Sequence, residues 1–121
     1  MISYVTLGTN DLEKSAAFYD AVLAPLGARR GPETARYKSW LGPNRGPMLM
    51  IMKPFDGEPS TVGNGVMVAL GAESPEIVDA VYKAALEAGG ADAGEPGERR
   101  PGLYAGYFRD LDGNKLNAIS M

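Results

Sequence analysis

The chain has 121 residues, a length typical of one compact domain. It contains no cysteine and no histidine, which excludes disulfides, thiolate nucleophiles, metal centres held by these residues and histidine general bases. A net charge of −3 argues against nucleic-acid binding, and no apolar run approaches the roughly 20 residues that a membrane helix needs. The first residues lack the basic and apolar regions of a signal peptide, so the sequence predicts a soluble, cytoplasmic protein.

The first half of the chain is predicted to form a strand, a helix and two further strands. Residues 2–8 are apolar or β-branched, as in strands. Asn10 followed by Glu13 has the pattern of a capping box, and apolar residues then recur at helical spacing until Pro25 ends the helix. Residues 37–41 and 48–53 flank a turn rich in Gly, Pro and Asn, and we expect both to be strands.

The second half has the same order of elements. Residues 66–71 are predicted as a strand, and Ser74 followed by Pro75 indicates the start of a helix that ends at Gly89-Gly90. Two strands, 103–109 and 115–121, flank a turn whose Asp-Gly pair is a strong hairpin signal. Between the halves, residues 55–64 are rich in turn formers and are expected to connect them.

The two halves are also related in sequence. At an offset of 63, ten of the 25 residues in 4–28 are identical to their counterparts in 67–91. At an offset of 67, Tyr37 aligns with Tyr104, Trp40 with Tyr107 and Met50 with Asn117, which places four extra residues in a loop at 95–102. We predict one α+β domain over residues 1–121, made of two repeats, about 1–54 and 65–121, with 55–64 as the link.

Two stretches of the sequence resemble the vicinal oxygen chelate superfamily, which includes glyoxalase I, bleomycin-resistance proteins and extradiol dioxygenases. The first is the strand followed by GTNDLEKSAAFY (8–19), with Val22-Leu23 and Leu26-Gly27 after it; the second is the closing FRDLDGNKL (108–116). The resemblance covers nearly the whole chain. It implies two tandem βαβββ modules whose curved sheets form an open barrel around a cavity. It says little about the reaction, because one fold hosts many chemistries.

The resemblance also implies where a metal would bind. The family's metal enzymes take ligands from the first and last strands of each module. The repeat places Tyr4 and Met67 at equivalent points of the first strands, and Met50 and Asn117 at equivalent points of the last strands. Tyr, Met, Met and Asn do not make a site for a divalent ion. The sequence therefore predicts a member of the family that has no metal site and no cofactor.

The same positions suggest a pocket for a ligand. Three methionines alternate on one face of the strand 48–53, and methionine adapts to irregular apolar surfaces. One interpretation is that these methionines only fill the core. The other is that they line a cavity for a small hydrophobic or aromatic molecule. The predicted ligand-binding residues are Tyr4, Trp40, Met48, Met50, Met52, Met67, Tyr107 and Asn117.

Other polar residues receive weaker interpretations. Arg36 or Lys38 would favour an anionic or carbonyl group on the ligand if either faced the cavity, and otherwise belongs to a solvated strand edge. Glu13, Lys14 and Asp20 are expected on the exposed face of a helix. Asp110 and Asp112 are expected to form a turn, since Asp side chains bond the backbone there. Tyr104 is either a proton donor or a packed aromatic residue.

Three functions remain open from the sequence. The first is a metal-free protein that binds a small hydrophobic or aromatic molecule. The alternative is a metal-independent enzyme of the family, a lyase or isomerase that detoxifies a small molecule with a Tyr or a buried carboxyl group. The third is a relic without a ligand. Glyoxalase I activity is disfavoured, because its chemistry relies on a metal as Lewis acid. The resemblance also implies a homodimer, with the cavity formed within one chain or across two.

Overall fold

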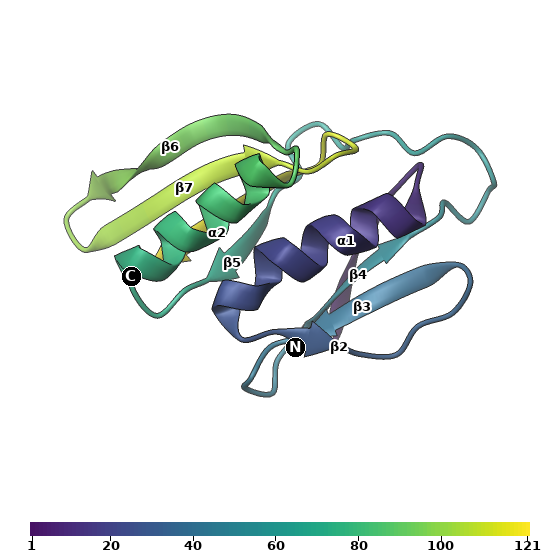
Figure 1. The fold of residues 1–121 in the computed structure, drawn as a ribbon, viewed down its shortest axis with the longest axis horizontal. Helices are drawn as coiled ribbons and strands as arrows, with labels where there is room; N and C mark the ends of the chain where they lie inside the picture. The colour runs from purple at the N-terminus through teal and green to yellow at the C-terminus, as the bar shows by residue number, and fades with distance from the viewer.

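The computed structural model describes all 121 residues and has the same element order in each half (Figure 1). The elements of the first half are β1 (Tyr4–Gly8), α1 (Leu12–Leu23), the 3-10 helix η1 (Ala24–Leu26), β2 (Arg29–Arg30), β3 (Tyr37–Leu41) and β4 (Met48–Met52). Those of the second half are β5 (Val68–Gly71), α2 (Pro75–Glu87), β6 (Ala91–Arg100), β7 (Leu103–Arg109) and β8 (Lys115–Ser120). Neither helix has the length and hydrophobicity that a bilayer crossing requires.

Each half forms one four-stranded sheet with the same strand order. The first sheet is β1-β4-β3-β2 and the second is β5-β8-β7-β6. In both sheets the first strand lies parallel to the last, and the remaining pairs are antiparallel. This arrangement confirms the predicted α+β fold of two βαβββ modules. The sheets are curved, but they do not close into a barrel within the chain.

The two helices begin at side-chain caps. Ser74 accepts a hydrogen bond from the backbone N–H of Ile77, as expected from its place before Pro75. In α1 the cap is Asp11, whose Oδ1 accepts from the backbone N–H of Lys14 at 3.1 Å. The prediction of Asn10 as the cap was therefore wrong by one residue. The side chain of Asn10 instead bonds the backbone of Ser60, which ties the start of α1 to the segment between the modules.

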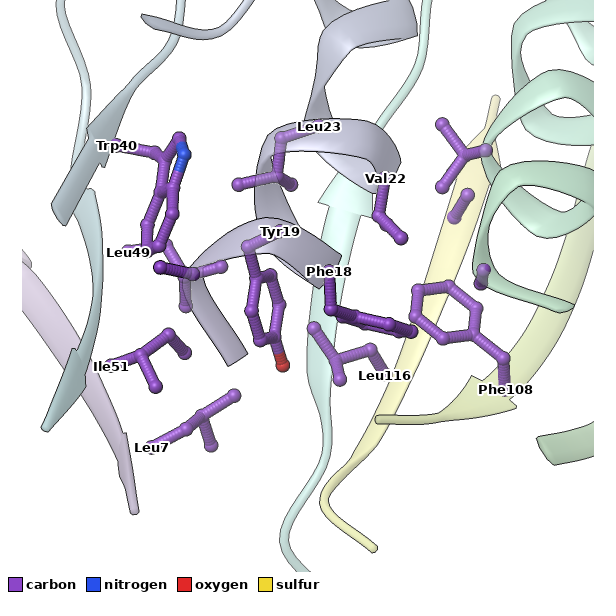
Figure 2. Close-up of a cluster of buried hydrophobic side chains, with 14 of the residues drawn as sticks. Leu7, Phe18, Tyr19, Val22, Leu23, Trp40, Leu49, Ile51, Phe108 and Leu116 are labelled. Carbon is purple, nitrogen blue, oxygen red and sulfur yellow. The ribbon is translucent and has the colours of Figure 1, made fainter. Parts of the chain in front are cut away.

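The core runs through both modules, and helix α1 lies inside it. In Figure 1 the two helices lie next to each other, with one sheet to each side. Phe18 of α1 packs against Phe108 of β7 with ring centroids 6.5 Å apart, while Tyr19 packs against Trp40 of β3 at 5.6 Å. Figure 2 shows buried side chains of the first sheet on one side of α1 and side chains of the second sheet on the other. Burying one helix between both sheets joins the modules into one domain.

The strand ladders test the alignment of the two repeats. Thr6 pairs with Met50 in the first sheet, and Ala69 pairs with Asn117 in the second, as the offsets of 63 and 67 require. Trp40, however, pairs with Leu49, and the equivalent residue Leu116 pairs with Phe108. Trp40 thus corresponds to Phe108, and its predicted alignment with Tyr107 was wrong. A shift of one residue moves a side chain to the other face of its sheet.

Two loops of the second module were also predicted from the sequence. Residues 95–102 were expected to form a loop, but β6 continues to Arg100 with bulges in its pairing to β7. The expected turn at Asp110 is confirmed, because its Oδ1 accepts hydrogen bonds from the backbone N–H groups of Asp112 and Asn114 at 2.9 Å each. Asp112 in turn accepts a hydrogen bond from the backbone N–H of Asn10. This turn therefore also anchors the start of α1.

Candidate functional site

The main apolar hollow of the molecule lies between the two sheets, beyond the end of α1. It encloses about 470 Å³, which is within the usual range of ~300–1,000 Å³ for a small-molecule site. We call it the seam cavity, because side chains of both modules line it. Twelve of its 16 lining residues are hydrophobic, and none has an ionisable side chain. The lining residues are Ile2, Val5, Leu23, Leu26, Ala28, Trp40, Gly42, Pro43, Pro47, Met48, Leu49, Met67, Val68, Ala69, Leu70 and Gly71.

Three of the predicted ligand-binding residues line the seam cavity. They are Trp40, Met48 and Met67. Met67 is exposed and Met48 half-buried, so their side chains can adjust to a ligand, whereas Trp40 is buried. The indole N–H of Trp40 donates to Asp20 at 2.9 Å, and the Arg30 guanidinium stacks 5.1 Å from its ring. The cavity therefore has one rigid aromatic wall and two flexible methionines.

Asp20 and Arg30 hold this aromatic wall in place. Arg30 binds both carboxylate oxygens of Asp20, at 2.7 and 2.9 Å. The hydrogen bonds from Arg30 lower the pKa of Asp20 below its ordinary value, with a smaller contribution from Trp40. Asp20 lies on the exposed face of α1, as predicted, and it also supports Trp40. No sequence pattern signalled this, because Asp20, Arg30 and Trp40 lie on three different elements.

The other five predicted residues lie outside the seam cavity. They are Tyr4, Met50, Met52, Tyr107 and Asn117. They lie on the sheet faces turned away from the helices. Side chains alternate along a strand, and their direct neighbours Leu49, Ile51 and Phe108 point into the core. Trp40 points to the helix side, so it does not share one face with Tyr107 as predicted. The eight residues thus divide between a cavity and two outer sheet faces.

Asn117 has an unusual environment for an amide. The residue is 2% exposed, and its Oδ1 is buried without a hydrogen-bond partner in the chain. A buried polar atom without a partner costs ~1–3 kcal/mol. It sits on β8 opposite Tyr107, at the position that the family resemblance assigns to a metal ligand.

The residues at the expected metal positions do not fit a divalent ion. Across both sheets these positions offer Tyr4, Met50, Met67 and Asn117, and so a phenol, two thioethers and one amide. Sites for divalent ions in proteins are built on carboxylate, imidazole or thiolate ligands, and none of these occurs at the four positions. Nowhere in the chain do three Asp or Glu side chains come together as a group that could hold a metal. We therefore assign no step of a mechanism to a metal.

The other polar candidates are engaged away from the seam cavity. Lys38 points to the helix side and lies 3.6 Å from Glu33 and 3.9 Å from Glu13. Arg36 stacks on Phe55 at 4.9 Å. Tyr104 donates to Asp79 of α2 at 2.7 Å and packs against the core. None of these side chains reaches the cavity as a ligand-binding or proton-transfer group.

Sequence reasoning missed most of the cavity wall. Val68, Leu70 and Leu26 line it, yet each has the pattern of an ordinary core residue. The glycines and prolines of the β3–β4 turn also line it and were interpreted only as turn formers. Their shared role depends on the packing of one module against the other. The repeat itself was the available signal, because it predicts a junction between two similar modules.

The family model described as "Glyoxalase/Bleomycin resistance protein/Dioxygenase superfamily" matches residues 1–118. No curated protein matches the chain.

Solved structures of the same fold include one with substantial sequence identity. A glyoxalase/bleomycin resistance protein from Albidiferax ferrireducens is 40% identical, with a TM-score of 0.90 and coverage of 98% of this chain and 97% of that chain. A hypothetical protein from S. aureus is 29% identical, with a TM-score of 0.77 and coverage of 100% and 95%. A lactoylglutathione lyase from Agrobacterium tumefaciens is 19% identical, with a TM-score of 0.71 and coverage of 98% and 92%, and shows the fold alone.

Proposed function

The chain belongs to the glyoxalase/bleomycin resistance protein/dioxygenase superfamily, and we propose that it binds a small hydrophobic or aromatic molecule in the seam cavity without a metal. The observation that carries this proposal is the cavity itself. It encloses about 470 Å³ and presents Trp40, Met48 and Met67 to the interior. An apolar wall with one aromatic residue suits an apolar ligand, because burying ligand surface there releases ~25 cal/mol per Å².

Binding receives more support than turnover. No lining residue of the seam cavity carries an ionisable side chain, so the cavity offers no general acid or base. The most deeply buried ionisable pair, Tyr19 and Asp110, lies in the core and lines none of the four main cavities. A metal-independent enzyme would need such a group beside its substrate. We therefore place the binding function ahead of the enzyme.

Fluorescence of Trp40 tests the proposal, because it is the only tryptophan of the chain and lines the cavity. The purified protein is titrated with 2-naphthamide, a neutral probe that accepts energy from tryptophan. We expect saturable quenching of Trp40. A linear, non-saturating response would contradict the proposal.

Two matched variants locate the binding site. Ala69→Phe adds a phenyl ring at a residue that lines the cavity, and is expected to weaken binding at least tenfold. Ala80→Phe makes the same change on the exposed surface of α2 and is expected to leave binding unchanged. Circular dichroism checks that both variants are folded. Equal affinity of the two variants would place the probe elsewhere.

We also propose that two copies of the chain pair. Each sheet leaves one long side of its first strand without a partner, because β1 pairs only with β4 and β5 only with β8. Exposed strand edges attract further strands. Ile2, Tyr4, Val66 and Met67 are exposed apolar residues at these edges. Light scattering after size-exclusion chromatography is expected to give twice the chain mass of 12.8 kDa, and Tyr4→Lys is expected to shift it toward one copy. A wild-type mass of one copy would contradict the pairing.

A further inference from the structure

The second sheet has a basic face turned away from the helices. Arg109 of β7 pairs with Lys115 of β8, and Tyr107 pairs with Asn117 one step along the same ladder. Side chains alternate along a strand, so these four residues share one face. The Arg99 guanidinium lies 5.3 Å from the centre of the Tyr107 ring, and Lys115 Nζ lies 5.5 Å from it. We call these five residues the basic face.

No carboxylate neutralises this face. None of the three cations takes part in an ion pair, although the chain has a net charge of −3. The outer positions of the neighbouring strand β6 include Gly94 and Gly97, whereas Asp92 pairs with Phe108 and points to the helix side. Asp92 accepts a 2.7 Å hydrogen bond from Tyr82 of α2. No carboxylate therefore pairs with these positive charges, although Arg99 donates to the carbonyl of Glu95 and Arg109 to that of Gly113.

A second cavity opens onto the basic face. It encloses about 560 Å³ between the segment 62–67, Arg109 and Lys115, and these two cations are its only charged side chains. Met67 lines both this cavity and the seam cavity, so the two adjoin at one flexible side chain. The backbone N–H groups of Gly63, Asn64 and Gly65 donate no hydrogen bond within the chain. The second cavity thus combines two cationic side chains with three unpaired backbone N–H groups, and it adjoins the seam cavity.

The unpartnered amide of Asn117 lies on the same face. The residue is nearly fully buried, and its Oδ1 is an acceptor, so it forms no hydrogen bond with an anion. The equivalent strand of the first module, β4, instead has Met50 and Met52 on its outer face. One module is therefore apolar where the other is polar and positively charged.

From this contrast we infer that the ligand is an amphipathic organic anion, an apolar or aromatic body with one carboxylate. The apolar body occupies the seam cavity, and the carboxylate lies by Arg109 and Lys115 on the far side of Met67. This inference rests on the proposed function for the apolar part only. Charge-assisted hydrogen bonds to a carboxylate are stronger than neutral ones, and the surrounding cations raise the local concentration of anions.

The test compares two probes that differ only in charge. The wild-type protein is titrated by calorimetry with 2-naphthoate and with the neutral 2-naphthamide, at low and at high salt. We expect 2-naphthoate to bind roughly two- to fivefold more tightly at low salt, in line with partly exposed charge pairs. The advantage is expected to shrink at high salt, because salt screens exposed charges.

A matched pair of variants assigns the effect to the basic face. Lys115→Gln is expected to remove most of the preference for 2-naphthoate over 2-naphthamide. Lys83→Gln removes the same charge from the exposed surface of α2 and is expected to preserve the preference. Arg109 is left intact, because its guanidinium bonds the carbonyl of Gly113 in the adjacent turn.

The outcomes separate this inference from the proposed function. Equal affinity for both probes would overturn the inference and leave the apolar binding function in place. Loss of the preference in Lys83→Gln as well would assign it to net charge and overturn the inference. Failure of both probes to bind would overturn both proposals.

Discussion

The hydroxyl of Tyr19 donates a 2.6 Å hydrogen bond to Oδ2 of Asp110, across 91 residues of sequence. This bond joins α1 of the first module to the β7–β8 turn of the second. Asn114 also donates to Asp110 Oδ2 and to the carbonyl of Gly8, each at 2.9 Å. Burial raises the pKa of Tyr19 well above its ordinary value, and the negative charge of Asp110 raises it further. The pair is therefore a structural connection between modules.

Tyr19→Phe is expected to lower the free energy of unfolding by about 1–3 kcal/mol at neutral pH, because it removes a buried hydrogen bond to a charged acceptor. The wild type is also expected to lose stability above pH 10. The folded protein retains the Tyr19 proton more strongly than the unfolded chain, so this contribution is full below the unfolded pKa and falls as the pH rises. Urea unfolding at neutral and alkaline pH measures both effects. An alkaline loss of equal size in Tyr19→Phe would contradict this role.

The fluorescence of Trp40 during an acid titration should report the protonation of Asp20, because the two side chains are hydrogen-bonded. Its lowered pKa means that the folded protein keeps this carboxylate charged below the ordinary value of 3.8, so its contribution to stability is lost only as the pH falls through the lower folded pKa. We expect a fluorescence change with a midpoint below 3.8, and no such change in Asp20→Asn. A wild-type midpoint above 3.8 would show that, in solution, Arg30 does not stabilise the charged form of Asp20.

Phe18→Ala tests the packing of α1 between the sheets. Phe18 is 2% exposed and contacts the rings of Tyr19 and Phe108. Its removal is expected to cost about 3–5 kcal/mol, the usual range for a buried aromatic residue. Phe55→Ala is the control, because Phe55 is 90% exposed and its ring stacks on the Arg36 side chain at the surface. Similar losses in both variants, by urea unfolding, would argue against a shared core.

Gly8→Ala tests how the segment between the modules is placed. A Cβ on Gly8 would collide with Ser60 Oγ and lie 3.2 Å from Ser60 Cβ, so Ser60 would have to move and its segment would be pushed away from β1. We expect a loss of about 1–3 kcal/mol in the free energy of unfolding, as for overpacking. Gly46→Ala is a suitable comparison, since its nearest neighbour would be 3.9 Å from the new Cβ. If Gly8→Ala were as stable as Gly46→Ala, the segment would not pack against β1.

The sequence predicted the fold because its signals were local and repeated. Apolar periodicity, Ser74 before Pro75 and the turn at Asp110 each depend on neighbours in the chain. The second occurrence of the same pattern then indicated two modules. The repeat also predicted that Met50 and Asn117 are equivalent, and the ladders confirm this, since Thr6 pairs with Met50 and Ala69 pairs with Asn117.

The candidate site was predicted less well because it depends on register and on packing between modules. The identity of Tyr37 and Tyr104 suggested an offset of 67 for β3 and β7, but the ladders require 68, since the turn before β8 is one residue shorter. That single residue moved Trp40 from the outer face to the core. The junction that forms the seam cavity has no local pattern, because its walls come from segments far apart in sequence.

The most direct measurement is native mass spectrometry of the purified protein incubated with 2-naphthamide and, separately, with Zn²⁺ and Mn²⁺. The account predicts an adduct of one 2-naphthamide per chain and no stoichiometric metal adduct, because the cavity is apolar and the strand positions offer no metal-binding set. One tightly bound metal ion per chain without a 2-naphthamide adduct would contradict it.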